Sequence, residues 1–186
     1  VLKGQVEGIG AKPRLEAEDG DRRQLIDESY APGEVPDVAS ALERLYGWLQ
    51  GRLEGVLPLA VGHRVVHGGP DYSGPVRVDA AVLRDLERLV DLAPLHQPNN
   101  LAPIQAILAH YPDLPQVACF DTAFHRGHPE PADRFAIPEA FYEEGVRRYG
   151  FHGLSYEYIA RRLKELDPEL ARGRIVVAHL GSGASM

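Results

Sequence analysis

The chain has 186 residues, enough to bury the core of one domain or of two small ones. It is 44% hydrophobic and 25% charged, as globular proteins are, and its net charge of −7 argues against a nucleic-acid-binding surface, which would need a basic stripe. No apolar run is long enough to span a bilayer, and the single cysteine, Cys119, excludes an internal disulfide and a cysteine-based zinc site. We therefore expect a cytoplasmic protein whose partners are neither nucleic acids nor membranes.

The first third of the chain predicts a strand, a polar segment and a helix. Residues 1–9 alternate enough to form a strand, whereas residues 11–34 are polar and rich in turn formers, which indicates loops. After Asp37, a suitable N-cap, apolar residues recur at helical spacing. The residues of this apolar stripe are Val38, Leu42, Leu45, Leu49 and Leu53.

Residues 58–69, "PLAVGHRVVHGG", predict a strand because they are rich in valine and bounded by proline and glycine. Successive strand side chains point to opposite faces, so His63, Val65 and His67 share one face and Arg64 lies on the other. On a strand, two residues four positions apart are separated by about 13 Å. The two histidines are therefore too far apart to bind one metal ion together.

The remaining elements alternate between helices and strands. The expected ranges are 79–92, 101–110 and 156–166 for helices, and 116–121 and 175–180 for strands. Asp79 and Ser155 are the expected N-caps, residues 93–100 a proline-rich loop, and residues 133–149 a mixture of loop and short helix. This alternation predicts an α/β fold, in which ligands bind at the carboxyl ends of the strands.

Chemically versatile residues lie where these strands end. Arg64 is late in one strand, and Asp121 directly follows another. Arg64 can bind a carboxylate or phosphate with two hydrogen bonds, or it can form a structural ion pair. Asp121 can orient a cation, or it can serve as a turn former or helix cap.

Three further segments are candidates for a functional site. His96 lies in a loop stiffened by two prolines, although a loop histidine can also be merely solvated. His152 lies just before a helix N-terminus, where the backbone potential suits anions. The glycine turn at residues 181–183 can lay N–H groups along phosphate oxygens, or it can simply end a strand, and it lacks the lysine of a Walker-type loop.

Five stretches of the sequence resemble, in order and spacing, the acetate kinase family of short-chain carboxylate kinases: "GHRVVHGG", "LAPLHQPNNL", "FDTAFH", "YGFHGLSYEY" and "HLGSGAS". The resemblance covers nearly all of the chain from residue 57 onward. It implies two α/β, ribonuclease H-like domains of the acetate and sugar kinase, Hsp70 and actin superfamily. Residues 1–122 would form the first domain without its first hairpin, and residues 123–186 the truncated start of a second, nucleotide-binding domain.

The resemblance also implies an activity: transfer of the γ-phosphoryl of ATP to acetate, giving acetyl phosphate and ADP, with Mg²⁺. Arg64 would hold the carboxylate or the transferring phosphoryl, and Asp121 would be the family's catalytic acidic residue. His152 would stabilise the transition state, and His96 would be a further active-site histidine. The ATP phosphate loop would contain His179, Leu180, Gly181, Ser182 and Gly183. The family also suggests a homodimer, and propionate or butyrate remain open as alternatives to acetate.

Physical chemistry and the departures from the family pattern refine these expectations. Acetate is already ionised at neutral pH, so Asp121 is expected to orient Mg²⁺ or Arg64 rather than to abstract a proton. Leu154, Tyr156 and Ser182 stand where the family has threonine, histidine and asparagine, and Gln97 replaces another asparagine. Leu154 and Tyr156 both flank His152, so its hydrogen-bonding support is expected to differ.

The chain starts inside an apparent strand without an initiator methionine and stops just after another strand, so we expect a fragment. The family's first phosphate hairpin, second active-site arginine, adenosine pocket and late metal-binding glutamate are missing. An alternative is therefore that the chain alone is a non-catalytic domain that binds carboxylate or phosphate weakly, or only dimerises. A third hypothesis is a histidine-based metal hydrolase.

Overall fold

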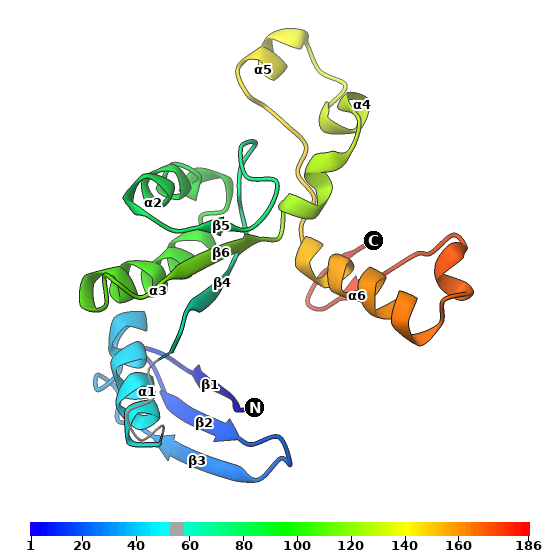
Figure 1. Ribbon diagram of the computed structural model, residues 1–186. Coiled ribbons are helices and arrows are strands. Elements are labelled where there is room, and N and C mark those ends of the chain that lie inside the picture. The colour runs from blue at the N-terminus through cyan, green and yellow to red at the C-terminus, as the bar shows by residue number, and fades with distance from the viewer. Residues whose placement is uncertain (53–57) are drawn as a thin grey trace. The chain divides into compact units, whose positions relative to one another are not determined.

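The computed structural model of the protein describes residues 1–52 and 58–186 (Figure 1). Leu53, expected at the end of the first helical stripe, lies outside the described residues. Two compact units make up the chain: unit 1 contains residues 1–60 and 102–114, and unit 2 contains residues 61–101 and 115–186. Within the described residues, no helix is both long and apolar enough to cross a membrane. The boundary expected at residue 122 stays a prediction.

Unit 1 is built on a three-stranded antiparallel sheet in the order β1 (Lys3–Glu7), β2 (Arg14–Glu18) and β3 (Gln24–Ser29). Leu15 and Ala17 on β2 are buried, while Arg14, Glu16 and Glu18, which alternate with them, are half-buried. The strand expected within residues 1–9 is confirmed, but the expectation of loops throughout residues 11–34 was wrong. β2 and β3 are short and carry charged residues on their solvent faces. The alternation of apolar and polar residues that indicates a strand is therefore hard to recognise in this polar sequence.

The helix expected after Asp37 is confirmed as α1 (Val38–Arg52). Asp37 caps it as predicted, because its Oδ1 accepts a hydrogen bond of 2.8 Å from the backbone N–H of Ser40. Tyr46 on this helix packs against Tyr111, with ring centroids 4.6 Å apart.

Unit 2 contains a second sheet of three strands, in the order β4 (Val61–Val65), β6 (Gln116–Phe120) and β5 (Val76–Arg77). β4 runs parallel to β6, with Arg64 opposite Cys119 and Val65 opposite Phe120. β5 runs antiparallel to β6. Because β4 and β6 are parallel, the residues that end them lie at the same edge of the sheet.

The expected division of the β4 side chains between two faces is confirmed. His63, Val65 and His67 are all buried, whereas Arg64 is exposed. The ring of His63 hydrogen-bonds to the side-chain carbonyl of Gln116 at 2.7 Å, which satisfies a polar group inside the core. Burial lowers the pKa of both His63 and His67, so both rings favour the neutral form.

The helices that cover this part of the chain differ from expectation mainly at their ends. α2 (Ala80–Glu87) is capped by Asp79 as predicted but stops five residues earlier, and a 3₁₀ turn, Val90–Leu92, follows it. α3 (Gln97–His110) begins four residues earlier than expected, inside the supposed proline-rich loop. Pro98 is the second residue of α3, where no N–H donor is needed, and Pro94 lies in the turn before the helix.

The last part of unit 2 contains the short helices α4 (Glu130–Asp133) and α5 (Glu139–Glu143), then α6 (Gly153–Leu166). The expected N-cap of α6, Ser155, was wrong: the cap is His152, whose backbone is left-handed with φ of 59°.

Only the end of the strand expected at residues 175–180 forms, as β7 (His179–Leu180), which pairs antiparallel with β8 (Ala184–Ser185). A strand is stabilised by hydrogen bonds to a neighbouring strand. Within the described residues, β8 pairs with only these two positions of the expected strand.

Candidate active site

The parallel register of β4 and β6 brings Arg64 and Asp121 together. Asp121 directly follows β6, and its backbone N–H donates to the carbonyl of Val65 at 3.1 Å. The guanidinium donates from Nε to both carboxylate oxygens at 3.2 Å and from Nη2 to Oδ2 at 2.7 Å. The Asp121 side chain is only 2% exposed, whereas that of Arg64 is 62% exposed. The pair is therefore anchored on its acidic side and open on its cationic side.

The hydrogen bonds of the pair leave part of the guanidinium available. Bonding to Asp121 raises the pKa of Arg64, so the side chain stays a cation. Within the described residues, Nη1 of Arg64 has no hydrogen-bond partner. An arginine in this state can still bind a carboxylate or phosphate oxygen.

The start of α6 is fixed against the same strand end. The backbone N–H of Gly153 donates to the carbonyl of Asp121 at 2.9 Å. A Cβ atom at residue 153 would lie 2.3 Å from that carbonyl oxygen and 2.6 Å from Cβ of Phe124. Only glycine allows the backbone at residue 153 to come this close to Asp121. The preceding residue, His152, which has a left-handed backbone, is thereby held close to Asp121.

His152 belongs to a small hydrogen-bonded cluster. Its Nδ1 lies 2.8 Å from Oγ of Ser185, which in turn lies 2.5 Å from the hydroxyl of Tyr156. The ring stacks on that of His179, with centroids 4.0 Å apart and planes within 6° of parallel. Nδ1 of His179 bonds Oγ of Ser155 at 3.2 Å. Burial lowers the pKa of His152, and His179 lowers it further, so His152 favours the neutral form.

A cavity of about 900 Å³ joins these groups within unit 2. Of the residues singled out from the sequence, its wall includes Arg64, His96, Asp121, His152, His179 and the turn at residues 181–183. Leu180 is not on that wall, and its side chain is 75% exposed. The expectation that separate loops contribute to one hollow therefore agrees with the geometry, while the role of each residue stays a prediction.

Sequence reasoning missed the hydroxyl groups that support the two histidines. Ser155 lies one turn after His152, a spacing that could have indicated a link to the site. Ser185 is 33 residues from His152, and its contact depends on the β7–β8 hairpin, which has no local sequence signal. Tyr156 was noted as a departure that would alter the hydrogen bonding of His152, but its link through Ser185 was not predicted.

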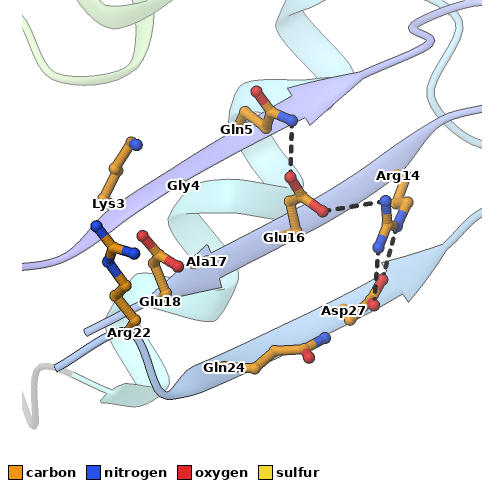
Figure 2. A pocket seen from close by; sticks show the side chains of 10 residues that line it. All are labelled: Lys3, Gly4, Gln5, Arg14, Glu16, Ala17, Glu18, Arg22, Gln24 and Asp27. Carbon is orange, nitrogen blue, oxygen red and sulfur yellow. Dashed lines mark hydrogen bonds and ion pairs between the residues drawn. The ribbon is translucent and has the colours of Figure 1, made fainter. Parts of the chain in front are cut away.

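A second hollow of about 430 Å³ lies on the polar face of the unit 1 sheet, and Figure 2 shows the side chains that line it, with α1 behind the strands. Several of its charged groups pair with one another. Arg14 bonds Asp27 and lies 3.0 Å from Glu16, which also accepts a hydrogen bond from Gln5. The guanidinium of Arg14 is therefore matched by several acids, unlike that of Arg64.

The donor set of the cavity fits phosphate better than metal. A guanidinium, three histidine rings and the backbone of a glycine turn are all groups that bind phosphate oxygens. Across residues 1–52 and 58–186, no three His, Cys, Asp or Glu side chains gather so as to hold a metal ion. Among the described residues on the cavity wall, Asp121 is the one carboxylate, and both of its oxygens already bond Arg64. These residues fit a nucleotide's phosphates but form no magnesium site of their own.

A strand-end guanidinium, histidine rings and a glycine turn thus surround one hollow of an α/β fold, and these are groups suited to binding phosphate and carboxylate. A family model described as the acetokinase family matches residues 13–186. The chain belongs to this family.

Named relatives agree with this assignment. The chain is 61% identical over 185 residues to an acetate kinase of Nitrobacter hamburgensis, covering all of this chain and 46% of the relative. It is 60% identical to an acetate kinase of Rhizobium meliloti, covering 47% of it. The chain thus spans less than half the length of these curated relatives.

Two solved structures share the fold, and the expected fold class is confirmed. The acetate kinase of Porphyromonas gingivalis matches with a TM-score of 0.81 and 34% identity, over 98% of this chain and 47% of that one. A propionate kinase from Francisella tularensis subsp. tularensis SCHU S4 matches with a TM-score of 0.85 and 33% identity, over 98% and 46%.

Proposed function

We propose that the whole protein, of which this chain is a part, transfers the γ-phosphoryl of ATP to acetate, giving acetyl phosphate and ADP, with Mg²⁺ as the accompanying ion. The observation that carries this proposal is the guanidinium of Arg64, anchored by a buried aspartate and open to a cavity that it shares with His96, His152 and a glycine turn. Membership of the acetokinase family and the names of the relatives support it.

The chemical step needs no base to activate its nucleophile. Acetate is ionised at neutral pH, because free carboxyl groups titrate near about 4. One of its oxygens forms the bond to the γ-phosphorus, while the bond to the β–γ bridging oxygen breaks and ADP leaves with that electron pair. Asp121 takes no proton in this scheme: its oxygens hold the guanidinium, which makes it a positioning residue.

The cationic and hydrogen-bonding side chains stabilise the charge that spreads over the phosphoryl oxygens. Arg64 binds the acetate carboxylate or the transferring phosphoryl through the part of its guanidinium that Asp121 leaves free. His152 donates a hydrogen bond to the same group without adding a second full charge. The backbone N–H groups of Ser182 and Gly183 bind the nucleotide's phosphates, since the N–H of Gly181 already donates to the carbonyl of Gly183.

The acyl group is assigned to the apolar part of the cavity wall, which includes Val66 and Leu92. We propose acetate as the preferred substrate, with propionate as a poorer one. A single methylene changes discrimination by only about 1–3 kcal/mol, so the preference is expected to be modest. We also propose that the whole protein is a cytoplasmic homodimer.

The test is an assay of the full-length protein, expressed from its complete gene, for acetyl phosphate formation from Mg-ATP and acetate, with propionate and butyrate in parallel. We expect the highest kcat/KM with acetate. Absence of any ATP-dependent acyl phosphate would contradict the proposal.

The chain of 186 residues has a second candidate function when alone, because it spans less than half of its relatives. It would bind acetate, phosphate or Mg-ATP weakly without turnover, which calorimetry can measure. Robust turnover by these residues alone would exclude that alternative.

A further inference from the structure

Three polar groups form a line that ends at His152. The hydroxyl of Tyr156 lies 2.5 Å from Oγ of Ser185, and that oxygen lies 2.8 Å from Nδ1 of His152. Tyr156 is on α6 and only 6% exposed, while Ser185 is on β8. The order Tyr156–Ser185–His152 therefore joins a buried phenol to a ring on the cavity wall.

The protons of this line can be placed by counting donors and acceptors. The serine and the tyrosine have one O–H each, and each proton needs an acceptor. If Ser185 donated to Tyr156, the phenol proton would need another acceptor, and within the described residues the Tyr156 hydroxyl has only Ser185. A buried phenol without an acceptor is unfavourable, so Tyr156 donates to Ser185.

The direction of the first bond fixes the second. The Ser185 oxygen accepts the proton of Tyr156, so the hydroxyl proton of Ser185 itself needs an acceptor, and that acceptor is Nδ1 of His152. Nδ1 of His152 then carries no hydrogen, and in the neutral ring the proton must be on Nε2. The parallel ring of His179, 4.0 Å away, holds the plane of the imidazole.

We infer that Tyr156 is a positioning residue that, through Ser185, holds His152 as the Nε2–H tautomer and so presents an N–H donor to an anion in the cavity. The consequence for phosphoryl transfer rests on the proposed function, whereas the tautomer itself does not. A neutral ring with a fixed N–H is useful beside Arg64, because it adds a hydrogen bond to the anion without a second full charge.

The tautomer can be measured directly in the full-length protein with ¹⁵N in its histidine rings only. NMR distinguishes the two nitrogens by which one bears the proton, and the His152 signals are assigned by their loss in His152→Gln. We expect Nε2–H in the unsubstituted protein. A measurable share of Nδ1–H should appear in Tyr156→Phe and in Ser185→Ala. Tyr158→Phe, an exposed tyrosine on the same helix, is the matched control and should change nothing.

Two results would overturn the inference: a predominant Nδ1–H form in the unsubstituted protein, or an unchanged tautomer in both Tyr156→Phe and Ser185→Ala. The first measurement needs neither Tyr156→Phe nor Ser185→Ala, so it decides even if those two proteins do not fold.

Kinetics separate the inference from the proposed function. In an active full-length enzyme, Tyr156→Phe should lower kcat roughly ten- to a hundredfold, by analogy with the loss of a hydrogen-bond partner that orients a metal-ligating histidine. KM for acetate and ATP should stay within about twofold, because the bond acts in the transition state. An inactive full-length protein with the Nε2–H tautomer would defeat the proposed function alone. An active enzyme whose kcat is indifferent to Tyr156→Phe would defeat the inference alone.

Discussion

Two arginine–aspartate pairs, one in each unit, have similar bonds and different surroundings. Arg14 donates to Asp27 from Nε at 2.7 Å and from Nη2 at 2.9 Å, as Figure 2 shows. Arg64 donates to Asp121 from the same two nitrogens, at 3.2 and 2.7 Å. Bond geometry alone does not separate a surface ion pair from a binding site.

The difference lies in exposure and in how many acids each guanidinium meets. Arg14 and Asp27 are about equally exposed, and Arg14 also lies 3.0 Å from Glu16 and 3.6 Å from Glu7. Arg64 bonds one carboxylate, which is buried, while most of its own side chain is exposed. Arg14 has its charge matched several times within the sheet, whereas Arg64 keeps positive charge for a ligand.

The comparison suggests a general criterion. A buried acid can fix a guanidinium without neutralising its outer edge, because the acid approaches from the protein side only. An exposed cluster of acids surrounds its arginine and leaves little to bind. Parallel substitutions in the two pairs test this difference most directly.

The largest effect is expected at the two arginines. Arg64→Ala in the full-length enzyme should lower kcat/KM by roughly a thousandfold or more, the size associated with an arginine that stabilises a transferring phosphoryl. Arg14→Ala should leave kinase activity near that of the unsubstituted enzyme, since Arg14 pairs only with residues of its own sheet face. Steady-state assays of acetyl phosphate formation check both. Equal losses in the two variants would remove the distinction between the pairs.

A smaller loss is expected at the two aspartates. Asp121→Asn keeps the shape of the side chain but weakens its hold on the guanidinium, and misplacement of a reacting group by about 1 Å can cost about a hundredfold in rate. The matched change Asp27→Asn should leave kcat unaltered. If Asp121→Asn instead abolished activity as fully as Arg64→Ala, with a changed pH–rate profile, Asp121 would be a base rather than a positioning residue.

The third prediction concerns the backbone that fixes Asp121. Gly153→Ala would force a Cβ to within 2.3 Å of the Asp121 carbonyl oxygen, and such overpacking typically destabilises by about 1–3 kcal/mol. The control is Gly74→Ala, where an added Cβ meets nothing within 4 Å. Denaturant unfolding of both variants measures the difference. A Gly153→Ala protein as stable as Gly74→Ala would show that the contact between α6 and β6 can relax.

Much of the sheet in unit 2 could be predicted from local pattern. The valine-rich run around Arg64 and the strand before Asp121 have strong β-propensity, and their parallel pairing follows from the helices between them. The caps Asp37 and Asp79 were predictable because an N-cap acts within three residues along the chain.

Long-range support for the site could not be predicted in the same way. The bonds of Ser185 to His152 and Tyr156 join residues about thirty positions apart, and nothing in the intervening sequence specifies them. The left-handed backbone of His152 was also missed, because Ser155 offers a better cap by residue type alone. The tight contact of Gly153 with Asp121 decides that start instead.

The smallest expected effect is a difference between the two units in how their stability depends on pH. Burial lowers the pKa of His63 and His67 below the ordinary 6.5, so below that pH the unfolded chain binds more protons than the folded one. The stability of unit 2 should therefore fall as the pH drops from 7.5 to 5.5, above the range in which ordinary carboxylates titrate. Unit 1 has no buried histidine among its described residues, since its one histidine, His110, is exposed.

Hydrogen exchange can resolve the two units within one sample. After correction for intrinsic rates, amides of β4 and β6 should lose protection at pH 5.5 relative to pH 7.5, while those of β2 should change less. His67→Gln removes one of the two buried rings next to this sheet and should shrink the loss in β4 and β6, whatever its effect on stability at pH 7.5. Protection in β4 that stays constant across this range would mean that the buried rings accept protons without cost, against the desolvation argument on which the expectation depends.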